Sequence, residues 1–205
     1  MKKILLSMIT MASLSYGNGC VLVQADDINV TWKAYKTLAK LGVAGAFKDV
    51  TYHPNKKEGK NFKELFVGSK VTIDVTKVDT KNSGRDKTLV ESFFSKLAGK
   101  GIVGEIVAIK ADKSENGKRA YHGRVDVNLT MNEHTLIIPM HYNYKAGHFE
   151  AKGDIDLFDF GANGALSSLN KSCFDLHQGK TWNDVTIGFS TTVKATLCDV
   201  KIEKK

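Results

Sequence analysis

The chain has 205 residues, a formal net charge of +8 at pH 7 and 42% hydrophobic residues. Its length allows one domain with a sizeable core but is short for two domains. A basic balance of this size is compatible with anionic lipids or acidic partners, and equally with a merely solvated surface. No basic run interleaved with aromatic residues stands out, which argues against nucleic acid as a partner.

The N-terminus has the pattern of a secretory signal peptide. The run MKKILLSMITMASLSYG begins with two lysines ahead of an apolar stretch that is too short to span a membrane. Small residues favour cleavage after Ala25, so we expect residues 1–25 to be removed, with residues 26–205 forming a single domain in the periplasm. Cys20 offers an alternative as the lipid-bearing cysteine of a lipoprotein, although the three residues before it lack the usual leucine.

Strand-like alternation of apolar and polar residues dominates the first half of the expected mature chain. INVTWKAYK (28–36) and VAGAFKDVTYH (43–53) are predicted to pair, KVTIDVTKV (70–78) is a further strand, and GIVGEIVAIKA (101–111) is the next. Between the last two, Asp86 is expected to cap a helix. The apolar face of that helix consists of Leu89, Val90, Phe93, Phe94 and Leu97.

Residues 121–157 have the clearest pattern, a meander of three antiparallel strands. A turn at Asn132-Glu133 and a second turn at Ala146-Gly147 set the register. The predicted pairs are Leu129 with Leu136, Val127 with Ile138, Val125 with Met140, Gly123 with Tyr142, Tyr121 with Tyr144, Tyr144 with Phe149, Ile138 with Ile155 and Leu136 with Leu157. Apolar residues meet apolar residues or glycine in both hairpins, and a slip by one residue would destroy this agreement. Pro139 in the middle strand predicts a local irregularity.

The C-terminal part is predicted to contain a second helix and a long last strand. The helix runs from Gly164 to His177, with Gly179 as its C-cap, and DVTIGFSTTVKATLCDV (184–200) is the strand. Cys173 lies on the apolar stripe of the helix, and Cys198 lies on the strand. In an oxidising compartment the two are candidates for one disulfide, with two buried free thiols as the alternative.

The pattern favours an all-β fold of about eight antiparallel strands with two short helices, either a closed barrel or a sandwich. We prefer the eight-stranded barrel because Gly123, Ala151 and Gly153 flank Met140 and Tyr142 on neighbouring strands, which would leave open volume inside. Such a barrel is just wide enough to hold one small ligand. Alternatively, long side chains bend over the glycines and the interior is solid.

Several segments together resemble the YceI-like family of secreted bacterial proteins. They are VTWKAYKTLAKLGVAGAF, KVTIDVTKVDT, RDKTLVESFF and YHGRVDVNLTMNEHTLIIPMHYNY. The resemblance covers essentially all of residues 26–205, and ALSSLNKSCFDLHQGKTWNDVTIGF is similar to a subgroup of the family. It implies a lipocalin-like antiparallel barrel whose apolar cavity holds a polyisoprenoid, an isoprenoid quinone or a fatty-acid-like lipid. The expected role is transport, storage or sensing in the periplasm, with a link to stress as one option and with no cofactor beyond the bound lipid.

Cavity-lining positions follow from the phase of the predicted strands and helix. They are Val30, Trp32, Phe47, Ile73, Val75, Phe93, Phe94, Val125, Val127, Ile138, Met140, Tyr142, Ile155, Phe189 and Val193. Trp32 and Tyr142 could also donate a hydrogen bond to a ligand head group. For each position a plain core role is equally open.

Other functions find less support in the sequence. His122, Arg124, Asp126 and His141 share the polar face of the meander, where such clusters are usually solvated. The chain contains no HExxH, GxSxG, CxxC or phosphate-loop motif, so we expect neither an enzyme nor a metal site. The alternative to a lipid carrier is a ligand-free structural or interaction module that partners a membrane enzyme.

Three further features remain open at this stage. Asn29 in DINVT and Asn128 in DVNLT resemble acceptor sites of bacterial glycosylation, and chance matches of this kind are common. Transient contact with a membrane and association into a homodimer are compatible with the sequence.

Overall fold

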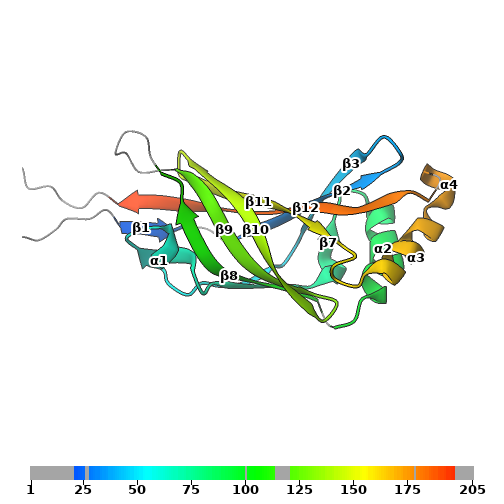
Figure 1. Ribbon diagram of the computed structural model, residues 1–205, viewed down its shortest axis with the longest axis horizontal. Helices are drawn as coiled ribbons and strands as arrows, with labels where there is room; N and C mark the ends of the chain where they lie inside the picture. Colours follow the sequence, from blue (N-terminus) through cyan, green and yellow to red (C-terminus); the bar gives the residue numbers. More distant parts are fainter. Residues whose placement is uncertain (1–20, 26–27, 100, 114–120, 178, 197–205) are drawn as a thin grey trace, which may run out of the picture.

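The computed structural model describes residues 21–25, 28–99, 101–113, 121–177 and 179–196. These residues form one curled antiparallel sheet with helices at its two ends (Figure 1). The strands are β1 (Val21–Gln24), β2 (Asn29–Lys36), β3 (Leu41–Phe47), β4 (Thr51–His53), β5 (Glu58–Gly59), β6 (Lys70–Ile73), β7 (Val78–Asp79), β8 (Ile102–Ala111), β9 (His122–Met131), β10 (His134–Lys145), β11 (His148–Asp156) and β12 (Thr181–Thr196). The helices are α1 (Phe62–Phe66), α2 (Ser83–Ser92), α3 (Asn163–Ser172) and α4 (Phe174–His177), with two 3-10 helices, η1 (Val75–Lys77) and η2 (Phe94–Lys96).

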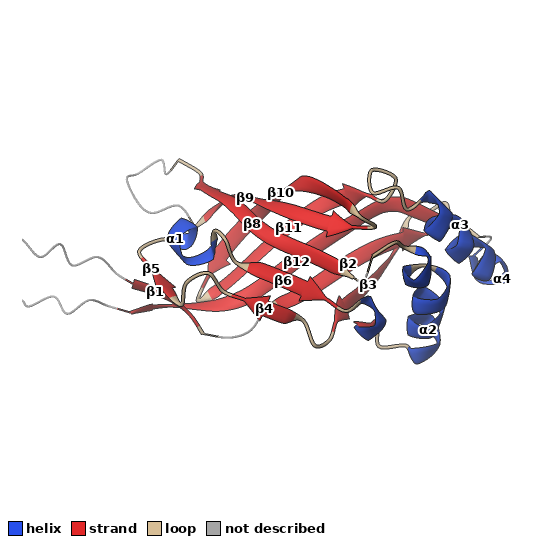
Figure 2. Cartoon of the chain, turned by 90° about the horizontal axis from the view of Figure 1, so that it is seen from below, coloured by secondary structure: helices blue, strands red, loops and turns tan. Residues whose placement is uncertain are grey.

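The sheet has the strand order β4-β6-β8-β9-β10-β11-β12-β2-β3-β7, and β1 pairs with both β12 and β5. The predicted all-β antiparallel class is therefore confirmed. The predicted closed barrel of eight strands is not, because the described residues contain twelve strands and β4 and β7 form the edges of a curled half-barrel. Viewed from below in Figure 2, α1 lies at one end of the half-barrel and α2, α3 and α4 lie at the other. No helix in the described part of the chain is long and apolar enough to cross a membrane.

Two predicted strands are interrupted, which raises the strand count. The predicted strand 43–53 divides into β3 and β4 at a turn where Asp49 has a φ of 54°. The predicted strand 70–78 ends early because the Asp74 carboxylate accepts a hydrogen bond from the Thr76 N–H at 2.9 Å and begins η1. Short polar side chains compete with the strand ladder for backbone N–H groups in this way.

The predicted helices exist with different boundaries. Helix α2 begins after Asn82, whose side chain accepts a hydrogen bond from the Arg85 N–H at 2.9 Å, so Asp86 is not its cap. Asp86 instead accepts hydrogen bonds from the Thr80 N–H and hydroxyl at 2.8 and 2.6 Å, which ties α2 to the end of β7. The predicted helix 164–177 divides into α3 and α4, and α1 was not predicted.

The predicted register of the meander is confirmed in its first hairpin and near the turn of the second. Met131 pairs with His134, and the ladder continues to Gly123 opposite Tyr142. Strands β10 and β11 pair from Lys145 with His148 to His141 with Lys152. That ladder ends at His141, two residues from Pro139. The missing pairs beyond it are the expected irregularity, because proline has no N–H to donate. The predicted pairs Ile138 with Ile155 and Leu136 with Leu157 are not part of it.

Strand β1 lies before the predicted start of the mature chain. Its four residues pair with Val193 to Thr196 of β12, and the Leu22 side chain is buried with 3% exposure. Cleavage after Ala25 would remove this strand, and the cleavage position remains a prediction. Residues 1–20, which include most of the expected signal peptide, lie outside the described residues.

An aromatic cluster fills the interior at the end of the sheet that α1 covers. The rings of Phe62 and Phe66 in α1 pack against Phe149, with centroids 5.0 and 4.8 Å away. Tyr142 stacks on the same Phe149 ring at 5.1 Å. Because close-packed aromatic rings leave little free volume, this end of the half-barrel is solid.

Candidate functional site

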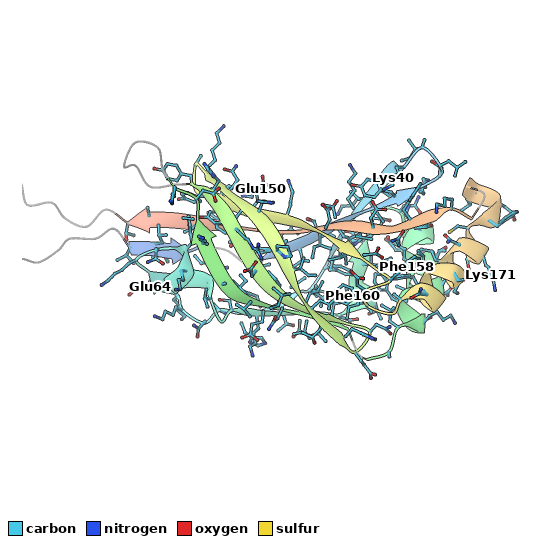
Figure 3. All side chains as sticks on the ribbon, in the orientation of Figure 1. Lys40, Glu64, Glu150, Phe158, Phe160 and Lys171 are labelled. Atoms are coloured by element: carbon cyan, nitrogen blue, oxygen red, sulfur yellow. The ribbon has the colours of Figure 1, made fainter. Side chains whose placement is uncertain are left out.

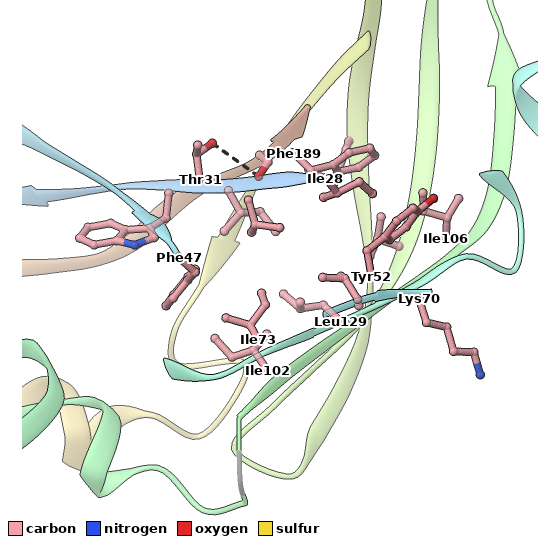
Figure 4. A pocket seen from close by; sticks show the side chains of 18 of the residues that line it. Ile28, Thr31, Phe47, Tyr52, Lys70, Ile73, Ile102, Ile106, Leu129 and Phe189 are labelled. Carbon is pink, nitrogen blue, oxygen red and sulfur yellow. Dashed lines mark hydrogen bonds between the residues drawn. The ribbon is translucent and has the colours of Figure 1, made fainter. Parts of the chain in front are cut away.

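An apolar cavity, here called the inner cavity, lies inside the curled sheet beyond the aromatic cluster (Figure 4). Strands from both sides of the half-barrel line it, with Val30 on β2, Ile106 on β8, Leu129 on β9 and Phe189 on β12. The volume of the inner cavity is about 100 Å³. A space so narrow and so apolar suits a slender hydrocarbon chain better than a bulky polar molecule.

The few polar groups around the inner cavity are mostly satisfied by the protein itself. The Tyr52 hydroxyl donates to Gln24 Oε1 at 2.9 Å, and the Thr31 hydroxyl donates to the Gly188 carbonyl at 3.5 Å. Burial raises the pKa of Tyr52, opposed by its hydrogen bonds to Ser69 and Gln24, so the phenol stays neutral. The Lys70 side chain points away from the cavity (Figure 4), and its ammonium lies 3.3 Å from Glu105.

A second space, here called the outer cavity, lies at the helical end of the molecule. Residues of β2, α2, α3 and α4 line it, including Lys36, Arg85 and Leu176. Its volume is about 440 Å³. A narrow gap of about 70 Å³, here called the throat, lies between Trp32, Leu89, Phe94 and Leu166 among others. The throat shares Trp32, Ala34, Leu89, Leu169 and Thr181 with the outer cavity, and it shares Trp32 alone with the inner cavity. The throat therefore adjoins the outer cavity, and one side chain borders all three spaces.

Trp32 is the residue that all three spaces have in common. Its indole Nε1 is buried and has no hydrogen-bond partner within the described residues. The ring lies over Gly45 on β3, where an added Cβ would come within 2.5 Å of Trp32 Cζ2. Glycine at position 45 is thus what allows the indole to lie at the junction. A buried donor without a partner is costly, and a polar group of a ligand that reached it would remove that cost.

The residues predicted to line a cavity divide into three groups. Those that line the inner cavity are Val30, Trp32, Phe47, Ile73, Val127, Met140, Ile155 and Phe189. Phe93 and Phe94 line the throat instead. The structure does not place Val75, Val125, Ile138, Tyr142 or Val193 at either cavity or at the throat, and all five belong to the surrounding core.

The structure adds lining residues that the sequence analysis did not nominate. They include Ile28, Tyr52, Val71, Ile102, Ile106, Leu129, Met131 and Ile187. Val71, Leu129, Met131 and Ile187 lie in phase with nominated neighbours on β6, β9 and β12, so alternation along those strands could have found them. Strand β8, which contributes Ile102 and Ile106, had no nominated residue. Tyr52 is different, because the interruption of the strand 43–53 sets its orientation.

The glycines expected to leave open volume do not do so. A Cβ on Gly123 would come within 2.8 Å of Tyr142 Cε1, and one on Gly153 would come within 3.0 Å of Met140 Cγ. The side chains of Tyr142 and Met140 already occupy the space beside these two glycines. At these positions the structure therefore agrees with the alternative prediction, in which long side chains bend over the glycines. The space of the inner cavity is found beside Gly104 and Gly188.

Tyr142 has a buried hydroxyl without a hydrogen-bond partner in the described part of the chain. Its exposed fraction is 2%, and burial, aided by the charge of Asp112, raises its pKa. It lies within the aromatic cluster, next to Phe62 and Phe149, and not at the inner cavity. The predicted contact between this hydroxyl and a ligand head group therefore has no support in the geometry.

The predicted disulfide stays untested. Cys173 is buried next to α3, and burial raises the pKa of its thiol, whereas Cys198 lies outside the described residues. Strand β12 begins at Thr181, whose N–H donates to Asn170 of α3 at 2.8 Å, and ends at Thr196 opposite Val21. The described strand thus leads away from Cys173.

The two glycosylation candidates differ in exposure. Asn29 is exposed at the start of β2, and Asn128 is half-buried within β9 between two neighbouring strands. Glycosylation of either remains a prediction.

The polar cluster on the outer face of the meander is built from exposed ion pairs. His122 Nδ1 lies 2.7 Å from Asp112, and Arg124 Nε lies 2.5 Å from Asp126. The described residues hold no group of three or more His, Cys, Asp or Glu side chains arranged for a metal ion. Exposed pairs of this kind contribute little to stability and do not form a cleft.

Comparisons with known proteins agree with the geometry. The model of the YceI-like domain matches residues 23–193. Among solved structures, the chain is similar to a polyisoprenoid-binding domain from Saccharophagus degradans, with a TM-score of 0.54, 11% identity and coverage of 86% of this chain and 98% of that one. No curated protein sequence matches significantly.

Two further solved structures share the fold. Burkholderia cenocepacia BcnA has a TM-score of 0.53 at 16% identity, covering 82% of this chain and 96% of BcnA. The YceI protein of Campylobacter jejuni has a TM-score of 0.50 at 17% identity, covering 96% of this chain and 99% of that one. At these identities the structures establish the fold, and the domain match establishes the family. The chain belongs to the YceI-like family.

Proposed function

We propose that this protein holds a long-chain amphiphile, such as a polyisoprenoid, an isoprenoid quinone or a fatty-acid-like lipid, and that it carries or stores this lipid in the periplasm. The observation that carries the proposal is the inner cavity, a narrow space lined almost wholly by aliphatic and aromatic side chains inside the curled sheet. The fold shared with a domain described as polyisoprenoid-binding supports the same class of ligand.

The polarity of the three spaces suggests how the lipid lies. The hydrocarbon tail fits the inner cavity, whose lining offers it no ionic partner apart from Lys70, which points outward. The head group fits the throat and the outer cavity, where the Trp32 indole N–H lacks a partner and Arg85 and Lys36 line the wall. The head group would then be an oxygen-bearing, uncharged or anionic group.

The hydrophobic effect would drive binding. Burial contributes about 0.8 kcal/mol per CH2, so a dozen methylenes offer roughly 10 kcal/mol before the cost of ordering the chain. The empty inner cavity is small, so a long tail requires the side chains around it to move apart or the tail to extend through the throat. A ligand held this strongly would remain bound through gentle purification.

A pair of valine substitutions tests the site. Val30→Phe places a larger side chain in the inner cavity, while Val103→Phe adds the same group on the outer face of β8, where Val103 is 39% exposed. We expect Val30→Phe to weaken binding of a fluorescent polyisoprenoid analogue about fivefold or more, because overpacking costs about 1–3 kcal/mol. Val103→Phe should bind like the wild type.

Thermal unfolding of both variants separates lost binding from lost folding. If Val30→Phe folds and still binds the analogue as tightly as the wild type, the inner cavity is not the lipid site. The alternative function, a ligand-free interaction module, would then gain weight.

A further inference from the structure

Four large apolar side chains project into solvent at the helical end of the molecule. Leu38 and Leu41 belong to the β2–β3 hairpin and are 79% and 56% exposed. Phe174 and Leu176 belong to α4 and are 65% and 80% exposed. We call these four side chains the apolar tip. Exposed apolar groups gathered at one place commonly mark an interaction site.

The hairpin and the segment after α4 are bonded to each other, so the apolar tip belongs to one end of the protein (Figure 1). The Thr37 N–H donates to the Lys180 carbonyl at 2.9 Å, and the Trp182 indole donates to the Thr37 carbonyl at 2.7 Å. Phe174 is held beside Gly179, where an added Cβ would come within 3.1 Å of its ring. These contacts fix the base of the hairpin relative to α4.

The segments that carry the apolar tip are rich in lysine. Residues 33–42 and 171–184 contain Lys33, Lys36, Lys40, Lys171 and Lys180 against two carboxylates, Asp175 and Asp184. Lys40 and Lys180 lie over the Trp182 ring at 4.5 and 4.2 Å from its centroid. Figure 3 shows Lys40 and Lys171 at this end, whereas the labelled carboxylates Glu64 and Glu150 lie away from it.

The outer cavity reaches the surface at the same place. Leu176 of the apolar tip and Lys36 of the lysine group both line its wall. A partner that covers the tip would therefore also cover this part of the outer cavity.

We propose that this end of the protein docks on a lipid bilayer whose surface carries anionic head groups. A bilayer offers an apolar layer for the four side chains and phosphates for the lysines, and lysine stems can lie along the apolar layer with their ammonium groups in the head-group region. A second copy of the chain would bring like-charged lysine groups together, which disfavours self-association through this face. Docking places the opening of the outer cavity against the lipid.

Vesicle sedimentation tests this proposal with substitutions at exposed positions. The wild type should sediment with vesicles of phosphatidylethanolamine and phosphatidylglycerol, and bind pure phosphatidylcholine vesicles more weakly. The double variant Leu38→Glu, Leu176→Glu should bind the anionic vesicles about tenfold more weakly than the wild type, or weaker still. Its matched control is Ile137→Glu, because Ile137 is 62% exposed on β10, outside the tip.

Separate variants test how much the lysines contribute to vesicle binding. Lys40→Gln with Lys171→Gln should lower binding to the anionic vesicles by about fivefold per lysine, and added salt should lower wild-type binding in the same direction. Lys63→Gln with Lys152→Gln removes as much charge elsewhere on the surface and should change binding little.

Three results would overturn the proposal. They are wild-type protein that does not sediment with anionic vesicles, a tip variant that binds as well as the wild type, and a dimer in solution that the tip substitutions disrupt while vesicle binding is absent. Vesicle binding reports on the surface and lipid retention reports on the inner cavity, so either proposal can fail without the other.

Discussion

Trp32 combines three properties that make it the central residue of the candidate site. It borders both cavities and the throat, its ring depends on the glycine at position 45, and its buried indole N–H lacks a partner within the described residues. A buried donor left unpaired in the empty protein gains a hydrogen bond when a polar head group arrives. Trp32 would thereby favour amphiphiles over plain hydrocarbons.

Trp32→Phe tests this role, because it keeps an aromatic ring and removes the N–H. We expect the variant to bind a prenyl alcohol about fivefold more weakly than the wild type, corresponding to about 1 kcal/mol for one hydrogen bond. Binding of an isoprenoid hydrocarbon without a head group should change less, as titration of both ligands would show. Equal losses for the two ligands would mean that ring packing alone explains the effect.

Asp79 stabilises the turn that leads from β7 to α2. Its carboxylate accepts hydrogen bonds from the Lys81 ammonium at 2.7 Å and the Lys81 N–H at 3.0 Å, and the Lys48 ammonium lies 3.2 Å away. The hydrogen bonds from Lys81, followed by Lys48, hold the pKa of Asp79 well below its usual range. Lys81 has a φ of 59°, so these contacts also hold a backbone conformation that lysine rarely adopts.

Because the pKa of Asp79 is lowered in the folded protein, the stabilisation that this carboxylate provides depends on pH. It is fully present above the unfolded pKa of about 3.9 and is lost as pH falls below that value toward the lowered folded pKa. Asp79→Asn should therefore unfold at lower urea concentration than the wild type at pH 7, and the difference should shrink as pH falls below about 4. Asp159→Asn, at an exposed carboxylate, is the control. A difference that stays constant with pH would contradict this account.

The elements show what the sequence could predict about the fold. The meander was predictable because two short turns and a period of two fix which residues face each other, and one wrong register would have reversed both faces. The early end of the predicted strand 70–78 was not predictable, because it depends on local hydrogen bonds from the Thr76 N–H and hydroxyl to the Asp74 carboxylate. Helix α1 has five residues, too few for a periodic pattern, and is held by its contacts with Phe149.

The sequence could predict which residues of a strand face the interior, but not which of these residues line the cavity. Alternation correctly placed Val127 and Tyr142 on the same inner face, yet Val127 lines the inner cavity and Tyr142 lies in the aromatic cluster. The difference arises from α1, whose aromatic side chains fill one end of the half-barrel. Contacts between elements distant in sequence decide where free volume remains, and phase alone does not contain that information.

Strand β1 yields a prediction about the mature N-terminus. If the protein is exported as proposed, we expect it to begin at or before Val21, because a start at Asp26 would remove the strand that pairs with β12 and buries Leu22. The intact mass of the protein from the periplasm would show the start, and any lipid on Cys20 would appear as added mass.

A comparison of two chain lengths provides the control for this prediction. A chain that begins at Asp26 should be less stable than one that begins at Val21 by about 2 kcal/mol or more, since burying one leucine contributes about 1.5–3 kcal/mol. A natural start at Asp26, together with equal stability of the two chains, would contradict the prediction.

At the scale of the whole molecule, the two ends differ in packing and in surface. The α1 end is filled by aromatic rings, whereas the helical end contains the throat, the outer cavity and the apolar tip with its lysines. On the proposed function, a lipid would therefore enter or leave the described part of the chain at the helical end. This asymmetry matches a carrier that exchanges its ligand with a surface on one side.

The measurement that tests the central claim most directly is native mass spectrometry of the protein purified gently from the periplasm, followed by organic extraction of whatever is bound. The account predicts a discrete additional mass that moves into the apolar extract and identifies a long-chain amphiphile. Bare protein that also takes up no added polyisoprenoid, quinone or fatty-acid-like lipid would contradict it.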